Sequence, residues 1–232
     1  MSQEPSISIV LPAFNEEQGL DELLPTLKEL YPGHEILVID DGSTDATTFI
    51  CTKNNVKVIS HPYPIGNGAA IKTGARHAKG ELIVFMDADG QHDPKDISLL
   101  TDKLLNEGYD MVVGARELST HSTPIKRAGN WFYNRFASLM TGHTILDLTS
   151  GFRIVKAKIF RKFLYLLPNG FSYPTTSTMA FFRSAYPVGY VTIKARNRPK
   201  GTHSNIKILK DGVRFFVIIL KIGALYSPMR LF

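Results

Sequence analysis

Two aspartates separated by a single residue follow a short apolar run at residues 82–86, and this pair is the sharpest chemical signal in the sequence. At this spacing Asp87 and Asp89 can both turn toward one hard cation, and Gln91 adds a neutral oxygen. Mg2+ in proteins usually takes one or two carboxylates together with substrate phosphate oxygens and water. The pattern therefore predicts a site for a divalent metal that arrives with a diphosphate.

Other motifs of similar appearance fit less well. An EF-hand loop would place glycine where this chain has His92, and glutamate at position 98. An aspartyl-nucleophile phosphatase also carries Asp-x-Asp after an apolar strand. We expect that motif on the first strand, with Thr or Val in place of Gln91, so it stays a less favoured alternative. Gly66-Asn-Gly68 resembles the start of a dinucleotide fingerprint, but Ile71 occupies the third glycine position.

The elements that must position these residues alternate between apolar runs and helical patterns in the first half of the chain. We expect strands at residues 7–14, 35–40, 56–60, 82–86 and 111–113, and helices at 17–31, 67–78 and 95–106, with a short helix after residue 45. Strands that are apolar on both faces and alternate with helices are typical of a parallel sheet covered on both sides. The sequence predicts an α/β fold with a mostly parallel sheet.

Polar clusters follow four of these predicted strands, at residues 12–16, 40–43, 87–92 and 114–116. In open α/β sheets, ligands bind outside the carboxyl ends of the strands. A carboxylate at one strand end is often only a helix cap. The convergence of four clusters on one edge is therefore what predicts a functional site.

Charge is divided unevenly along the chain. Residues 1–110 carry 8 Lys/Arg and 18 Asp/Glu, whereas residues 111–232 carry 19 and 3. An acidic half suits a cation, and a basic half suits an anion such as phosphate, nucleic acid or an anionic membrane surface. Uneven surface charge without function is the alternative. The single cysteine, Cys51, excludes a disulfide scaffold, and no run reaches the ~18 apolar residues of a spanning helix.

Six short motifs carry a family resemblance. They are Pro12-Ala-Phe-Asn-Glu16, Val38-Ile-Asp-Asp-Gly-Ser43, Asp87-Ala-Asp-Gly-Gln-His-Asp-Pro94, Gly114-Ala-Arg116, Ser150-Gly-Phe-Arg153 and Arg198-Pro-Lys-Gly-Thr-His-Ser204. Each is weak alone, but their order and spacing are specific, and the match runs from about residue 6 to the end. On these residues the chain resembles the inverting family 2 glycosyltransferases of the GT-A fold, in the subgroup of dolichol-phosphate mannose synthase and polyprenyl-phosphate glycosyltransferases.

The resemblance implies roles for individual residues. Mg2+ or Mn2+ would be held by Asp87, Asp89 and Gln91. The donor nucleotide would be bound by Pro12, Ala13, Phe14, Glu16, Asp41, Gly68 and Asp87, with Asp41 near the base. The acceptor phosphate would dock where Arg116, Arg127 and Ser150 lie, and Arg153 and Arg198 would complete the basic pocket. These five residues and Asp89 form the expected catalytic set.

The acceptor class is suggested by a shortage of carboxylates in the second half. Relatives often place an acidic residue where this chain has Thr175-Thr-Ser-Thr178, and residues 111–232 contain only Glu117, Asp147 and Asp211. A hydroxyl acceptor must lose a proton to a base. A phosphate monoester, with a second pKa of about 6, is already anionic at neutral pH. A phosphate acceptor is favoured, and Asp147 is the one residue that keeps a hydroxyl acceptor open.

The stretch from residue 204 to 226 carries a membrane prediction. If it is helical, one stripe holds four basic residues beside a broad apolar surface: Lys207, Lys210, Arg214 and Lys221. Such a helix is typical of a membrane interface, and an amphipathic helix packed on the core is the alternative. We expect a catalytic domain at 1–203 and an interfacial segment at 204–232. In similar proteins a segment like 228–232 leads into transmembrane helices.

Together these patterns predict a metal-dependent hexosyltransferase that moves a sugar from a nucleoside diphosphate sugar, UDP-sugar favoured over GDP-mannose, to a polyprenyl or dolichyl phosphate. It would act at the cytoplasmic face of a membrane, with the nucleotide sugar, the lipid and the membrane surface as partners. No nucleic-acid partner is expected, because the basic stripe is interleaved with aliphatic residues and no nucleic-acid-binding signature is present. The alternatives are a glycosyltransferase with a hydroxyl acceptor and a non-catalytic membrane-associated nucleotide-binding protein.

Overall fold

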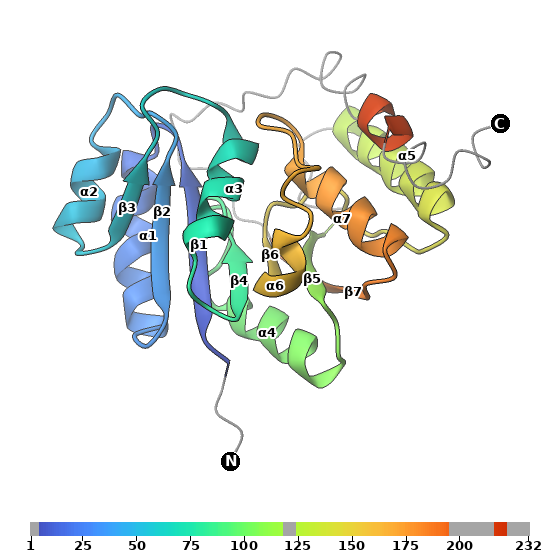
Figure 1. Ribbon diagram of the computed structural model, residues 1–232, viewed down its shortest axis with the longest axis horizontal. Coiled ribbons are helices and arrows are strands. Elements are labelled where there is room, and N and C mark those ends of the chain that lie inside the picture. The colour runs from blue at the N-terminus through green and yellow to red at the C-terminus, as the bar shows by residue number, and fades with distance from the viewer. Residues whose placement is uncertain (1–4, 118–123, 195–215, 222–232) are drawn as a thin grey trace.

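A central sheet organises the computed structural model, which describes residues 5–117, 124–194 and 216–221 (Figure 1). Its strands are β1 (Ile7–Ala13), β2 (Glu35–Asp40), β3 (Lys57–Ser60), β4 (Leu82–Phe85), β5 (Met111–Arg116), β6 (Arg153–Lys156) and β7 (Val188–Ile193). Their order across the sheet is β3-β2-β1-β4-β6-β5-β7. All neighbours pair in parallel except β6, which runs antiparallel to β4 and β5. The predicted mostly parallel sheet is confirmed.

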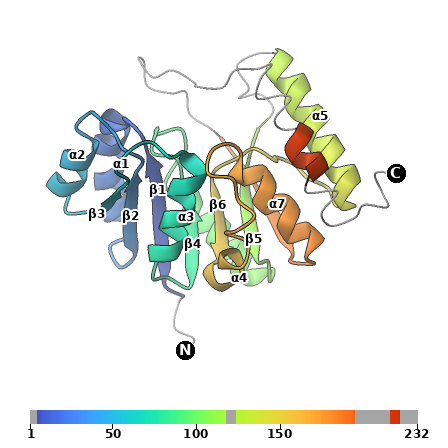
Figure 2. The same ribbon diagram turned by 45° about the horizontal axis from the view of Figure 1, so that its top comes forward.

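Helices cover both faces of this sheet, as the two views in Figures 1 and 2 show. They are α1 (Glu17–Leu30), α2 (Thr47–Lys53), α3 (Asn67–His77), α4 (Asp96–Asn106), α5 (Pro124–Thr141), α6 (Ala157–Arg161) and α7 (Tyr173–Arg183). One buried cluster joins the sheet to α1, α2 and α4, and another joins it to α3, α6 and α7. The sheet is therefore buried on both sides, as its continuously apolar strands require.

The period-2 geometry of a strand explains the two clusters. In β1, Ile9 and Leu11 face the cluster with α1, whereas Val10 between them faces the cluster with α3. In α1, leucines at helical spacing fill the first cluster: Leu20, Leu23, Leu24 and Leu27. Hydrophobic burial of this kind contributes about 25 cal/mol per Å2 of apolar surface. The sequence pattern and the packing agree throughout this half.

The second half contains elements that the sequence pattern did not predict. They are β6, β7 and α5 to α7, and α5 and α7 form a third buried cluster together with Ile219. Of the predicted helix at 204–226, the structure describes residues 216–221, which are helical. Ile219 is fully buried, as the core-packed alternative requires, while Phe216 and Val217 are exposed. The remainder of that prediction lies outside the described residues.

Within the described ranges, no helix combines the length and the hydrophobicity needed to cross a bilayer.

Candidate functional site

The site lies at the edge of the sheet where β1, β2, β4 and β5 end. These four strands run in the same direction, so the segments that follow them meet at the upper edge in Figure 1. The segments after β1 and β2 are tied together: the Asn15 amide donates to Ser43 Oγ at 2.9 Å, and the Thr44 amide donates to Asn15 Oδ1 at 2.8 Å. The two loops are therefore joined by hydrogen bonds and form one side of the site.

The loop after β4 holds the two predicted metal-binding carboxylates. Asp89 is buried, and its Oδ1 accepts a hydrogen bond from the Gln91 amide at 3.1 Å. Asp87 is partly exposed. Two glycines let neighbouring backbone approach this loop closely. A Cβ on Gly19 would lie 2.2 Å from the Ala88 carbonyl oxygen, and one on Gly151 would lie 2.8 Å from Asp87 Oδ2.

The residues of this loop fit a divalent cation by their chemistry. Asp87 and Asp89 supply hard anionic oxygens, Gln91 supplies an amide oxygen, and Gly151 leaves the space beside Asp87 clear of any side chain. Among the described residues no three His, Cys, Asp or Glu side chains cluster as a self-sufficient metal cage. A cation held here would take its other ligands from phosphate oxygens and water, as Mg2+ commonly does.

The side chain of His92 lies beside Asp87. Its buried ring stacks on Phe152 at 4.9 Å between centroids, and its Nε2 lies 3.8 Å from Asp87 Oδ2. That distance is too long for a hydrogen bond but places the ring directly beside the carboxylate. Nδ1 of His92 is buried and makes no hydrogen bond with any described residue.

Arg116, at the end of β5, is held by Asp147 in a bidentate ion pair. Arg116 Nε donates to Asp147 Oδ2 at 2.8 Å, and Nη2 donates to Oδ1 at 3.0 Å and to Thr149 Oγ1 at 2.6 Å. Asp147 Oδ1 also accepts hydrogen bonds from the amides of Thr149 and Ser150. Both carboxylate oxygens are thus occupied. Arg116 Nη1, in contrast, makes no hydrogen bond to any described residue.

Each partner of this ion pair stabilises the charged form of the other. Burial alone would raise the pKa of Asp147, but the guanidinium of Arg116 and the hydrogen bonds around the carboxylate outweigh it and lower that pKa below its ordinary value. Burial would likewise lower the pKa of Arg116, but Asp147, with smaller contributions from Asp87 and Asp89, raises it. Asp147 is therefore an anion at neutral pH, and Arg116 lies within electrostatic reach of the Asp87–Asp89 loop.

Arg153, by contrast, is completely buried. Its Nη1 donates to Ser177 Oγ at 2.8 Å and to the Pro174 carbonyl at 3.1 Å, and its Nη2 donates to the Ser150 carbonyl. The guanidinium also lies 5.4 Å from the ring centre of Tyr173. Burial lowers the pKa of Arg153. The side chain is placed to fix the start of α7 against the segment after Asp147. The predicted part of Arg153 in the basic pocket stays a prediction.

The other predicted acceptor residues lie in different surroundings. Ser150 is buried next to the Arg116–Asp147 pair, and its Oγ has no hydrogen-bond partner among the described residues. Arg127 lies in the first turns of α5 with its side chain exposed. Arg198 lies outside the described residues. The structure thus brings Ser150 together with Arg116 and leaves the roles of Arg127 and Arg198 as predictions.

On the predicted nucleotide side, Asp41 is buried and holds the segment that leads to α3. Its Oδ1 accepts from His61 Nδ1 at 2.7 Å and from the Ile65 amide at 3.0 Å, and its Oδ2 accepts from the Gly66 amide at 2.7 Å. His61 Nε2 lies 2.9 Å from Thr73 Oγ1. Because an ionised carboxylate only accepts, the Nδ1 atom of His61 carries the proton in this pair. The nucleobase contact predicted for Asp41 stays a prediction.

The remaining predicted nucleotide residues divide between surface and packing positions. Phe14 is 43% exposed at the end of β1, and Glu16 follows it at the start of α1, where its amide donates to Thr47 Oγ1. Pro12 and Ala13 are strand residues paired with β2. Gly68 has a packing role: a Cβ there would lie 2.1 Å from the Pro168 carbonyl oxygen.

Two features of the site could not be found from the sequence pattern. The Asp147–Arg116 pair joins residues 31 apart, and its only signal was the scarcity of acidic residues in the second half. The Asp41–His61 contact likewise depends on the parallel pairing of β2 with β3, which brings the residues after the two strands together. Both are tertiary contacts, and in neither pair are the two residues at a spacing typical of a motif.

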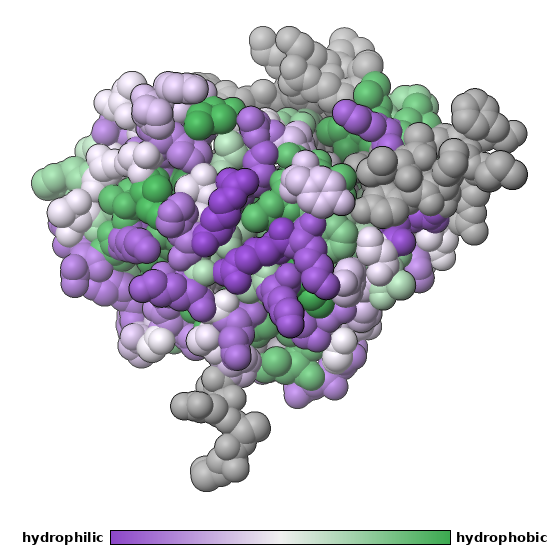
Figure 3. Space-filling view, viewed as in Figure 1, coloured by the Kyte–Doolittle hydropathy of each residue, from purple (hydrophilic) through white to green (hydrophobic). Residues whose placement is uncertain are grey.

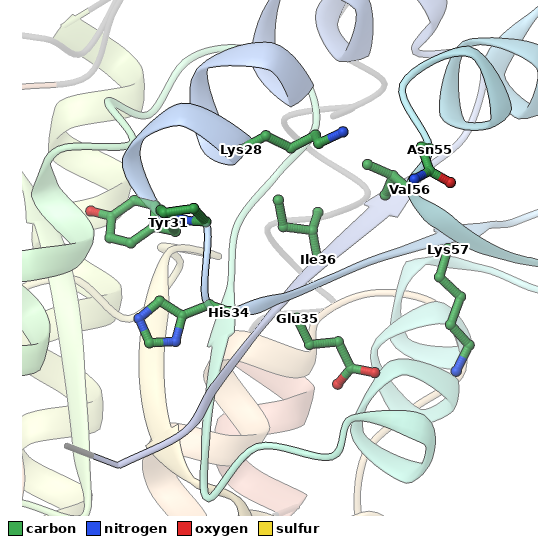
Figure 4. Close-up of a pocket in the computed structure, with 9 residues that line it drawn as sticks. Lys28, Tyr31, His34, Glu35, Ile36, Asn55, Val56 and Lys57 are labelled. Carbon is green, nitrogen blue, oxygen red and sulfur yellow. The ribbon is translucent and has the colours of Figure 1, made fainter. Parts of the chain in front are cut away.

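A separate pocket lies at the opposite edge of the sheet (Figure 4). It is lined by residues from the end of α1, the start of β2 and the start of β3, among them Lys28, Tyr31, Glu35 and Lys57. It opens near the amino ends of β2 and β3, whereas Asp87 and Arg116 follow carboxyl ends. This pocket is not part of the site.

Comparison with known proteins agrees with this geometry. The profile of the family described as "Glycosyl transferase family 2" matches residues 8–164. The uncharacterized protein MJ1222 of Methanocaldococcus jannaschii is 39% identical over 166 residues, covering 68% of this chain and 68% of its own length. Dodecaprenyl-phosphate galacturonate synthase of Rhizobium johnstonii is 31% identical over 170 residues, covering 69% of this chain and 50% of its own. The chain thus spans about half the length of that relative.

Among solved structures, glucosyl-3-phosphoglycerate synthase of Mycobacterium tuberculosis, crystallised with Mn2+ and UDP-glucose, superposes with a TM-score of 0.74 at 21% identity, covering 95% of this chain and 79% of its own. This likeness confirms the GT-A fold. Since the family profile covers well over half of the sequence, the chain belongs to glycosyl transferase family 2.

Proposed function

We propose that this family 2 glycosyltransferase moves a sugar from a nucleoside diphosphate sugar to a polyprenyl phosphate at the cytoplasmic face of a membrane. A UDP-sugar is the favoured donor and GDP-mannose the alternative. Two similar proteins have names that support this acceptor class: dodecaprenyl-phosphate galacturonate synthase, and a dolichyl-phosphate beta-glucosyltransferase of Trichomonas vaginalis, 30% identical over 168 residues.

The observation that carries the proposal is that both carboxylate oxygens of Asp147 already accept hydrogen bonds. In the sequence, this residue was the one that kept a hydroxyl acceptor open, because it could take a proton. In the structure, both of its oxygens accept hydrogen bonds from Arg116, and Arg116 together with the surrounding hydrogen bonds lowers its pKa. A carboxylate in this state is a poor base for a hydroxyl group. An acceptor that is already anionic needs no such base.

The chain's own groups then have separate tasks. Asp147 fixes the plane of the Arg116 guanidinium, so that Nη1 is left for an anionic oxygen of the acceptor phosphate or the departing diphosphate. Asp87 and Asp89 would hold the divalent cation, Mg2+ or Mn2+, and that ion neutralises charge on the diphosphate when bound. The hydrogen-bonded loops after β1 and β2 would hold the nucleoside. Fixing donor and acceptor in line contributes to the rate by orientation alone.

The test compares two acceptors with the same prenyl chain. The purified 232-residue chain is incubated in detergent with Mn2+ and radiolabelled UDP-sugars or GDP-mannose, and with either the polyprenyl phosphate or the neutral polyprenol. We expect label in lipid only with the phosphate. Transfer to the polyprenol would instead establish a hydroxyl acceptor. Nucleotide binding without label in either lipid would identify a non-catalytic nucleotide-binding protein.

A further inference from the structure

Helix α5 presents large apolar side chains to solvent. Trp131 is 65% exposed and Leu139 is 74% exposed, and Phe132 between them is also exposed. Single exposed apolar residues are ordinary, but several on one helix are a surface that needs an explanation. In Figure 3 hydrophobic surface appears at the upper right, where Figure 1 shows α5.

The exposed face of α5 alternates basic and apolar side chains. Arg127, Trp131, Arg135 and Leu139 are spaced four residues apart, so they follow one another along one side of the helix, and all four are exposed. The opposite side is buried, with Ala137 and Met140 in a cluster with Met179 of α7. This helix is therefore anchored to the protein on one side and exposed on the other.

Charge around α5 has one sign. The helix contains Lys126, Arg127 and Arg135, and the whole segment from residue 118 to 146 contains no aspartate or glutamate. An aromatic ring, aliphatic side chains and arginines on one helix face are the combination that binds at the boundary between lipid head groups and acyl chains. A protein partner would need acidic side chains to match these arginines, whereas an anionic bilayer supplies both the negative charge and the apolar layer.

The short helix at residues 216–221 extends this surface. Phe216 stacks on Phe136 of α5 at 5.3 Å between ring centres, and Ile219 is buried against the same helix. Its neighbours Val217 and Lys221 are exposed. Figures 1 and 2 both show the segment, coloured red, lying across α5. The described part of the C-terminal segment thus adds two exposed apolar side chains, Phe216 and Val217, and one basic side chain, Lys221.

We propose that α5 is a membrane-docking helix that places Trp131, Arg135 and Leu139 in an anionic lipid surface. The inference rests on the proposed function in one respect, since a lipid acceptor requires an enzyme that reaches the membrane. It differs from the prediction for residues 204–226, because it assigns the contact to a helix inside the catalytic domain. Because Arg127, which is predicted to bind the acceptor phosphate, begins the same face, this docking would bring a lipid phosphate toward that residue.

The sequence offers a direct probe, because Trp131 is the only tryptophan in the chain. The full 232-residue chain is mixed with vesicles of phosphatidylcholine containing phosphatidylglycerol, and Trp131 emission is recorded together with flotation of the protein. We expect a blue shift, and quenching by lipids brominated near the head group. Chain that floats with the vesicles while Trp131 emission stays unchanged would overturn the proposal, since another segment would then make the contact.

Substitutions distinguish the apolar from the electrostatic contribution to vesicle binding. Trp131→Gln with Leu139→Gln should weaken vesicle binding by roughly tenfold or more, because two apolar side chains no longer enter the lipid. Arg135→Gln should weaken it about fivefold, and the loss should disappear in high salt. The matched control is Phe49→Gln with Leu99→Gln, two apolar residues on α2 and α4 that are 65% and 51% exposed. Equal loss in this control, or none in the α5 variant, would refute the assignment.

Two further measurements keep this inference independent of the proposed function. Transfer in detergent should be unchanged by Trp131→Gln with Leu139→Gln, because neither residue belongs to the site. If the parent chain shows no transfer yet Trp131 still shifts on vesicles, the proposed function fails and the docking surface stands. A blue shift that depends on protein concentration without vesicles would show that a second copy covers α5, and the membrane assignment would be wrong.

Discussion

Replacing Asp147 by Asn tests whether this carboxylate orients Arg116 or acts as a base. The substitution keeps the size of the side chain but removes its charge and replaces one acceptor oxygen by an N–H donor. Asp147 accepts three hydrogen bonds from Arg116, one of them from the backbone amide at 3.3 Å, and three from Thr149 and Ser150. An asparagine amide cannot accept at both positions, so Arg116 loses its bidentate partner.

The expected magnitude follows from the burial of the pair. The side chains of Asp147 and Arg116 are 6% and 28% exposed. Breaking a fully buried pair costs about 3–5 kcal/mol, and partial exposure of Arg116 reduces this to about 2–3 kcal/mol. For a chain of this size, that loss lowers the Tm by roughly 5–10 °C. Loss of one oriented charge-assisted contact should lower kcat/KM for the lipid phosphate by roughly 10- to 100-fold.

A double-mutant cycle distinguishes the two roles. If Asp147 acts only through Arg116, then Asp147→Asn in an Arg116→Ala background should change kcat/KM by no more than about twofold. If Asp147 is a general base, its loss should cost roughly 100- to 10,000-fold in either background. The matched control is Asp110→Asn, which breaks the more exposed ion pair with Lys156 at the other edge of the sheet and should leave transfer unchanged.

Additive effects of the two substitutions would refute the orienting role and reopen the hydroxyl acceptor. The pH dependence of stability gives a second readout. The pKa of Asp147 is lowered in the folded chain, so the stability from its ionised form is complete above the ordinary aspartate pKa and is lost as pH falls through the lowered value. The difference in Tm between the parent and Asp147→Asn should therefore be constant near neutral pH and shrink only in acid.

Three further predictions concern the metal loop and the acceptor side. Asp89→Ala should abolish transfer while the protein stays folded, as judged by circular dichroism and by activity assays in Mn2+ and EDTA, and full activity in EDTA would contradict the metal assignment. Gly19→Ala should destabilise the protein by about 1–3 kcal/mol and weaken Mn2+ binding, because its Cβ would displace the Ala88 carbonyl; unchanged thermal unfolding and calorimetric Mn2+ affinity would argue against this coupling. Arg127→Ala should raise the KM for the lipid phosphate and leave nucleotide affinity unchanged, so a selective loss of nucleotide binding would place Arg127 on the donor side.

The first half of the fold was predictable because its packing is periodic. Strands such as β1, with Ile9 and Leu11 on one face and Val10 on the other, show their burial directly in the residue pattern. β6 was not predictable in this way, because a four-residue strand that opens with Arg153 lacks the flanking turns and length that identify a strand. Its antiparallel direction depends on the path of residues 117–152, which no local pattern specifies.

The same contrast applies to the site. The place of Asp87 and Asp89 at the end of β4 was predictable because they follow an apolar run, and their metal-binding role stays a prediction. The sequence could not distinguish the roles of Arg116 and Arg153, since each ends a short motif that carries the same family resemblance. The two arginines differ in burial. Arg153 is fully buried and donates hydrogen bonds to Ser177 and backbone carbonyls, whereas Nη1 of Arg116 has no hydrogen-bond partner among the described residues. Only tertiary structure decides which arginine can meet a ligand.

Four charged side chains lie at the predicted metal loop and the neighbouring Arg116–Asp147 pair. Asp87, Asp89 and Asp147 contribute three negative charges and Arg116 one positive charge, so these four side chains together have a net charge of −2. A nucleoside diphosphate would be repelled by that charge at short range. One divalent cation on Asp87 and Asp89 would bring the net charge of these four side chains to zero, and basic residues of the second half would then attract the donor and acceptor phosphates. Metal removal should therefore weaken nucleotide binding as well as transfer.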